Sequence, residues 1–114
     1  MIIPVERVLI REAVSASPIG ENLSCKELDI DDERVKCGEM NFPTRTIDNW
    51  GVFDHGGDFL DIFICSPELG KYGLEHFHAD VPRANAKPLI DFLNQRFPPE
   101  KLPKLRRNEF SKRI

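Results

Sequence analysis

The 114-residue sequence has no long apolar run, because charged or polar residues interrupt every apolar stretch after a few positions. A helix needs about 20 consecutive apolar residues to cross a bilayer, so no transmembrane span is predicted. The first residues, MIIPVERVLIRE, have no basic region ahead of the apolar ones and are unlike a secretory signal peptide. We therefore expect a cytoplasmic protein without a membrane partner.

Cysteine is scarce, with three residues, Cys25, Cys37 and Cys65, and no C-x-x-C pair. An odd number of cysteines without a signal peptide predicts free thiols. Cys25 and Cys37 would face each other across a hairpin only if the loop between their strands had three residues. Cys65 ends an apolar run and is expected to be a small core residue.

The common catalytic signatures are also missing. The sequence contains no G-x-S-x-G, no P-loop and no G-x-G-x-x-G, and it has no internal repeat. A Cys–His pair such as Cys65 with His76 remains open as a source of nucleophilic chemistry. Any function must therefore be argued from charge and from the placement of side chains.

What the sequence does contain is the composition of one globular domain, with 40% hydrophobic and 31% charged residues. This length is sufficient for a single core without metals or disulfides. We expect one α+β domain over residues 1–99 and a basic tail over residues 100–114. The tail has few apolar residues to bury and is expected to be loosely held.

Turn signals and alternating apolar residues predict strands between residues 23 and 81. Two strands flank the acidic stretch DIDDE, residues 45–65 read as a hairpin closed by Gly56 and Gly57, and LEHFHADV is the last strand. In the strand DFLDIFIC both faces are apolar, so Asp61 among the phenylalanines needs an explanation. The lone tryptophan, Trp50, is expected in the core.

A helix is predicted over residues 85–97, with Asn85 as its N-cap and Pro98-Pro99 as its end. Residues 4–14 are ambiguous, because helical spacing favours a short helix while the β-branched content permits a strand. The predicted fold is a four- or five-stranded, mostly antiparallel meander with the C-terminal helix on one face and a short N-terminal helix.

The charges are divided unequally along the chain. Residues 1–82 contain 16 acidic and 7 basic residues, a net charge of −9, whereas residues 83–114 contain 3 acidic and 9 basic residues, a net charge of +6. Such a division indicates electrostatic recognition of a partner, neutralisation of one end of the chain by the other, or simply a solvated acidic surface with a basic tail.

The first functional hypothesis is therefore a non-catalytic binding protein or inhibitor, similar in kind to immunity proteins and phage-borne inhibitors. It would present an acidic surface to a basic protein partner such as a nuclease or a nucleic-acid-binding protein. The residues expected to bind that partner are acidic and lie in or near the predicted turns: Asp29, Asp31, Asp32, Glu33, Asp54, Asp58 and Asp61.

The alternative hypothesis is a small metal-dependent enzyme. His76, His78 and Asp80 share one face of a strand, and His55 in the predicted glycine turn would lie near the same edge. Three imidazoles with a carboxylate suit zinc or iron with an open position for water. Two other interpretations remain open, namely surface histidines without a function and a proton-linked switch near neutral pH.

The basic tail suggests a third function, the binding of nucleic-acid phosphates, although the acidic body would repel the same polymer. The tail would alternatively pair with acids of a second copy and form a homodimer. The residues concerned are Lys101, Lys104, Arg106, Arg107, Lys112 and Arg113.

Overall fold

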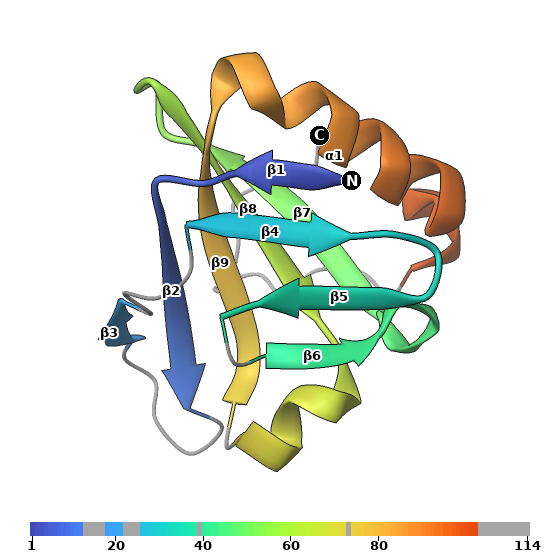
Figure 1. Ribbon diagram of the computed structural model, residues 1–114. Coiled ribbons are helices and arrows are strands. Elements are labelled where there is room, and N and C mark those ends of the chain that lie inside the picture. The colour runs from blue at the N-terminus through green and yellow to red at the C-terminus, as the bar shows by residue number, and fades with distance from the viewer. Residues whose placement is uncertain (13–17, 22–25, 39, 73, 103–114) are drawn as a thin grey trace.

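The computed structural model describes residues 1–12, 18–21, 26–38, 40–72 and 74–102. Its strands form two antiparallel sheets, which the ribbon view shows stacked with the strands of one running across those of the other (Figure 1). One α-helix packs beside them. The α+β class predicted from the sequence is confirmed, with two sheets where a single meander was expected.

Sheet A has the strand order β1-β4-β5-β6, with β1 at Ile2–Pro4, β4 at Glu27–Ile30, β5 at Arg34–Cys37 and β6 at Met40–Pro43. In β4 and β5 buried residues alternate with more exposed ones, as expected for strands with one face on a core. The acidic stretch lies between these two strands, as the sequence predicted.

Sheet B has the order β3-β2-β9-β8-β7, with β3 at Pro18–Glu21, β2 at Arg7–Glu12, β9 at Leu74–Pro82, β8 at Phe59–Cys65 and β7 at Asn49–Asp54. The predicted β7–β8 hairpin and the last strand are confirmed. The register of β8 and β9 pairs Asp61 with Asp80 and Cys65 with His76. The β7–β8 turn therefore lies at the end of β9 that carries Asp80.

The predicted N-terminal helix is wrong, because these residues form β1 and β2. The chain changes sheets between the two strands, where the N–H of Val5 donates to Lys26 O at 2.9 Å and the N–H of Glu6 donates to Asp80 O at 2.8 Å. Strand partners distant in sequence supply these bonds. Such non-local pairing outweighs a local helical spacing over few residues.

The core lies between the two sheets and the helix. On β8 and β9 of sheet B, side chains at alternate positions, such as Ile62, Ile64 and Phe77, are buried in the core, and Trp50 is fully buried, as predicted. The largest buried side chains are Trp50, Phe42, Phe63, Phe77, Leu28, Ile30, Ile62, Ile64, Leu69, Leu89 and Leu93. All of these except Phe63 belong to one continuous cluster.

Helix α1 spans Arg83–Arg96 and buries Ala86, Leu89 and Leu93, so the predicted helix is confirmed with its start two residues earlier. The predicted cap is wrong: Pro82 is the N-cap and no side chain caps the first turn. Arg83 is thereby the first helical residue.

Three short 3-10 helices complete the described chain: η1 at Thr44–Thr46, η2 at Pro67–Tyr72 and η3 at Pro99–Lys101. Leu102, after η3, packs against the core, and the rest of the basic tail lies outside the described residues. The part of the chain that the structure describes contains no helix long and apolar enough to cross a membrane.

The cysteines differ from expectation in one respect. Cys65 forms no disulfide, as predicted, and is partly buried. Cys37 is buried and disulfide-bonded, so the prediction of free thiols is wrong at this position. Cys25 lies outside the described residues.

Candidate functional site

The acidic turn, which we define as Asp31, Asp32 and Glu33, joins β4 to β5 and is exposed. Asp31 Oδ1 accepts hydrogen bonds from the backbone N–H of Glu33 at 2.8 Å and of Arg34 at 2.9 Å. An aspartate at the start of a turn commonly binds the backbone in this way. These bonds favour the ionised carboxylate and lower the pKa of Asp31, with the bond from Arg34 the larger cause.

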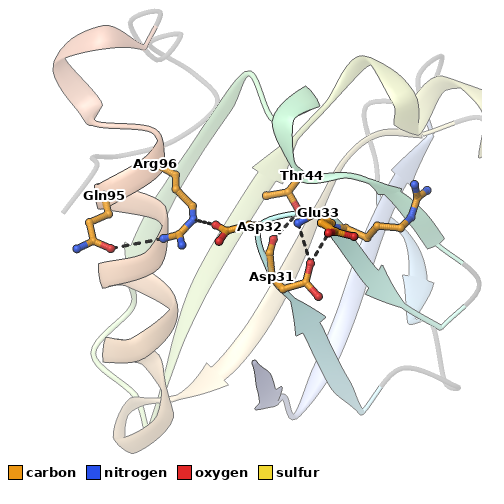
Figure 2. Close-up of polar contacts among 7 residues, drawn as sticks. Asp31, Asp32, Glu33, Thr44, Gln95 and Arg96 are labelled. Carbon is orange, nitrogen blue, oxygen red and sulfur yellow. Dashed lines mark hydrogen bonds and ion pairs between the residues drawn. The ribbon is translucent and has the colours of Figure 1, made fainter.

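Thr44, at the start of η1, ties the acidic turn to sheet A from the other side (Figure 2). Its hydroxyl donates to Asp31 O at 2.7 Å, and its N–H donates to Glu33 O at 3.0 Å. The backbone of the turn is thus bound on both sides. The carboxylates of Asp32 and Glu33 project from a turn of restricted conformation.

Asp32 reaches toward α1, where Arg96 Nε donates a hydrogen bond to its Oδ1 (Figure 2). This bond is the main cause of the lowered pKa of Asp32. The Arg96 guanidinium also lies over the ring of Phe92, 3.8 Å from its centroid, which fixes the cation in place. The Asp32 side chain remains 72% exposed, so water and other cations reach it.

A prediction about pH follows from the lowered pKa values of Asp31 and Asp32. A carboxyl whose pKa is lower in the folded state stabilises the fold above its unfolded pKa of about 3.9 and loses this contribution as the pH falls through the folded value. We expect Asp31→Asn to lower the urea midpoint of unfolding at pH 7 and to have a much smaller effect at pH 3. Midpoints measured by circular dichroism at both pH values test this, and an equal loss at the two pH values would contradict it.

The remaining predicted acids lie elsewhere. Asp29, on β4, is 3.8 Å from the N-terminal ammonium of Met1 and shares the hairpin of the acidic turn. Asp54 ends β7 and Asp58 lies in the β7–β8 turn, where Arg83 binds the Asp54 carboxylate and donates from Nε to Gly57 O at 2.6 Å. The bond to Asp54 raises the pKa of Arg83.

The predicted residues are therefore divided among three places. Arg83 and Arg96 begin and end α1, about 20 Å apart along its axis at 1.5 Å per helical residue, so they bind their two aspartate partners at opposite ends of the helix. Asp61 lies on the outer face of sheet B, 14% exposed and bonded to His78. Only Asp29 and the acidic turn form one local group, and whether that group binds a partner stays a prediction.

His76 and His78 lie on the outer face of sheet B, the face turned away from sheet A, and His55 lies in the β7–β8 turn. The rings of His76 and His78 meet edge to face with centroids 4.9 Å apart, so the prediction that they share a face is confirmed. His78 Nδ1 is 2.8 Å from Asp61 Oδ1, and His55 Nε2 is 3.7 Å from Asp61 Oδ2. This arrangement explains Asp61 in its apolar strand.

Asp80 faces Asp61 across the β8–β9 register. Within the residues that the structure describes, no group of three or more His, Cys, Asp or Glu side chains is arranged to hold a metal ion. His55 and His78 each lie near one carboxylate oxygen of Asp61. His76 is buried, with 3% exposure. The geometry thus offers a carboxylate–imidazole pair, and the proposed zinc or iron site stays a prediction.

Sequence reasoning missed Arg83, Arg96 and Thr44 as parts of these sites. The position of Arg96 in the last turn of a helix could have been noted from the sequence, because cations are favoured at the C-terminal end of a helix. Its partner, 64 residues away, is visible only in the fold. The threonine carries no local signal, since its bonds depend on how η1 packs against the acidic turn.

Comparisons with protein-family models, with curated proteins and with solved structures gave no match for this chain.

Proposed function

We propose that this chain is a non-catalytic binding protein that docks a basic protein partner through its acidic turn. The observation that carries the proposal is the backbone anchoring of Asp31, which presents Asp32 and Glu33 from a turn held by Arg34 and Thr44. A surface that is already ordered loses less conformational entropy on binding. The hydrogen bonds that lower the pKa values of Asp31 and Asp32 favour the ionised form of both carboxylates.

The partner expected from this chemistry is a protein with clustered lysines or arginines, such as a nuclease or another nucleic-acid-binding protein. Clustered carboxylates attract such a surface and raise the association rate at low salt. Occlusion of that surface would make the chain an inhibitor of the immunity type. The other acids contribute less, because Asp54 and Asp61 are only 35% and 14% exposed, whereas Asp32 is 72% exposed although Arg96 binds it.

Arg96 has a defined part in this proposal. It binds Asp32 in the free protein, so an arginine or lysine of the partner competes with it for the same carboxylate. Ion pairs that are exposed to water contribute little to stability, so this exchange is easily reversed. The pair orders the Asp32 side chain without removing it from solvent.

One observation argues against the cytoplasmic location that the sequence predicted. A cytoplasmic location was expected from the sequence, but a disulfide such as that of Cys37 is typical of oxidising compartments. We therefore do not restrict the partner to the cytoplasm.

The experiment that tests the proposal is capture of the partner from the native host with two matched double variants. Asp32→Asn with Glu33→Gln removes one arginine-paired and one exposed acid at the acidic turn. Asp54→Asn with Asp58→Asn makes the same change of charge in the β7–β8 turn. We expect a basic protein, identified by mass spectrometry, to be retained by the wild type and by the second variant and lost from the first. Equal retention by the two variants, or a captured partner without a basic surface, would contradict the proposal.

A further inference from the structure

The outer face of sheet A is the face turned away from sheet B and the core. In β4 and β5 the buried residues alternate with more exposed ones, so every second side chain points away from the core. Figure 1 shows sheet A in front of sheet B, with no helix or strand of the described chain lying over its near side. This face is therefore accessible to another molecule.

The charges on this face are sorted by strand. The side chains that β4 presents there are acidic, Glu27 and Asp29. Those that β5 presents there are basic, Arg34 and Lys36. The two strands are antiparallel neighbours, and their register places Asp29 directly opposite Lys36. The face thus has a negative half beside a positive half.

Within the described part of the chain, the opposed charges of Asp29 and Lys36 do not form an ion pair with each other. The Asp29 carboxylate lies 3.8 Å from the N-terminal ammonium of Met1, and the side chain is 45% exposed. Lys36 is exposed as well. Ion pairs between exposed groups are weak, so both side chains can turn toward another molecule.

The face is complementary to itself in one orientation. A twofold axis parallel to the strands, between β4 and β5, places β4 of each copy over β5 of the other. Rotation about this axis leaves positions along the strands unchanged, so Asp29 of each copy faces the partner's Lys36. A twofold axis across the strands would instead place β4 over β4 and acids over acids. Packed sheets lie about 10 Å apart, a gap that a lysine and an aspartate side chain span together.

We propose that the outer face of sheet A is the interface of a symmetric homodimer, in which Asp29 of each copy pairs with the partner's Lys36. Four strands of about four residues cover roughly 250 Å² in projection, well below the ~800 Å² per partner of a stable complex. The dimer is therefore weak and forms at high protein concentration. The inference goes beyond the docking of a basic partner, because a second copy of the chain occupies the face and residues outside the acidic turn supply the main contacts.

The same axis brings the acidic turns of the two copies to one end of the dimer. Arg34 lies opposite Asp31 at this end of the hairpin, where the N–H of Asp31 donates to Arg34 O at 3.1 Å. In the dimer Arg34 of each copy therefore lies over the partner's Asp31 and offsets part of the repulsion between the turns. The remaining repulsion acts over a longer distance and is screened at physiological salt. A basic partner would meet two acidic turns side by side.

Sedimentation equilibrium of the full chain, at physiological salt and up to millimolar concentration, tests the proposal. We expect the wild type to dimerise as its concentration rises. Asp29→Lys and Lys36→Asp should each raise the dissociation constant at least about ten-fold, because each variant places like charges face to face in both symmetric pairs. An equimolar mixture of the two variants should dimerise again, since every facing pair in that heterodimer contains one lysine and one aspartate.

The matched control reverses the same two charges on α1. Lys87 and Asp91 are 82% and 59% exposed and form an ion pair with each other. Lys87→Asp and Asp91→Lys should therefore change the dissociation constant by less than about two-fold. A wild type that stays monomeric at millimolar concentration, a mixture of the two sheet A variants that stays monomeric, or an equal loss of dimer in the α1 variants would overturn the proposal.

Amide chemical shifts of the wild type give a second measurement that needs no variant to fold. As the concentration rises, we expect the shifts of Asp29, Lys36 and their neighbours on β4 and β5 to change. Changes confined to sheet B or to α1 would overturn the proposal. The dimer is measured without the basic partner, whose capture is tested at Asp32 and Glu33, so the two proposals fail separately.

Discussion

Replacing Trp50 with alanine is expected to lower the free energy of unfolding by about 3–5 kcal/mol, the usual cost of removing a large buried aromatic side chain. Trp50 is fully buried on β7, one of the two edge strands of sheet B. Its indole Nε1–H donates to Phe97 O at 2.8 Å, where α1 ends. The side chain therefore both fills the core and bonds sheet B to the end of the helix.

Two variants separate these contributions. Trp50→Phe keeps much of the volume and removes the hydrogen bond, so it should cost about 1–3 kcal/mol, the penalty for a buried acceptor left unpaired. Urea unfolding should be followed by far-UV circular dichroism, because Trp50 is the only tryptophan and its removal abolishes the fluorescence signal. A cost below about 1 kcal/mol for the alanine variant would show that this contact between β7 and α1 contributes little to the fold.

The second large effect is expected at Gly51, which faces Phe63 across the β7–β8 register. A Cβ at this position would lie 2.6 Å from Phe63 Cζ and even closer to Cε1. Because the Phe63 ring is fully buried, it cannot move aside without disturbing its neighbours. Gly51→Ala should therefore cost roughly 1–3 kcal/mol, as other overpacked sites do, although alanine is no worse than glycine in an ordinary strand.

A double-mutant cycle tests this explanation. Phe63→Leu shortens the side chain that occupies the space, so Gly51→Ala should be less costly in the Phe63→Leu background than in the wild type. Equal costs in the two backgrounds would show that the contact between Gly51 and Phe63 is not the cause.

Much of the fold follows from local sequence patterns. The apolar stripe that includes Leu89 and Leu93 predicted α1, and alternation with turn residues predicted β4, β5 and the β7–β8 hairpin. The prediction of an N-terminal helix was wrong because a spacing of a few apolar residues cannot distinguish a short helix from a strand whose partners are distant in sequence. The division into two sheets depends on the change of sheet after Pro4, which has no local signature.

The candidate sites were less predictable. That His76 and His78 share a face follows from strand periodicity alone, whereas the position of Asp61 on that face depends on the register of β8 with β9. The partners of the acids do not, because Asp32 and Arg96 meet only when α1 packs beside the acidic turn. The hypothesis of one acidic surface assumed that the seven acids lie close together in the fold because they occur in the same acidic part of the sequence.

The most direct measurement is the association rate of the captured partner with purified wild-type protein, with Asp32→Asn/Glu33→Gln and with Arg96→Gln, at low and high salt. We expect the double variant to associate about ten-fold more slowly at low salt, and Arg96→Gln to associate faster, because it exposes an acid and removes a cation beside it. The differences should shrink at high salt. Equal rates for all three proteins at low salt would contradict docking through the acidic turn.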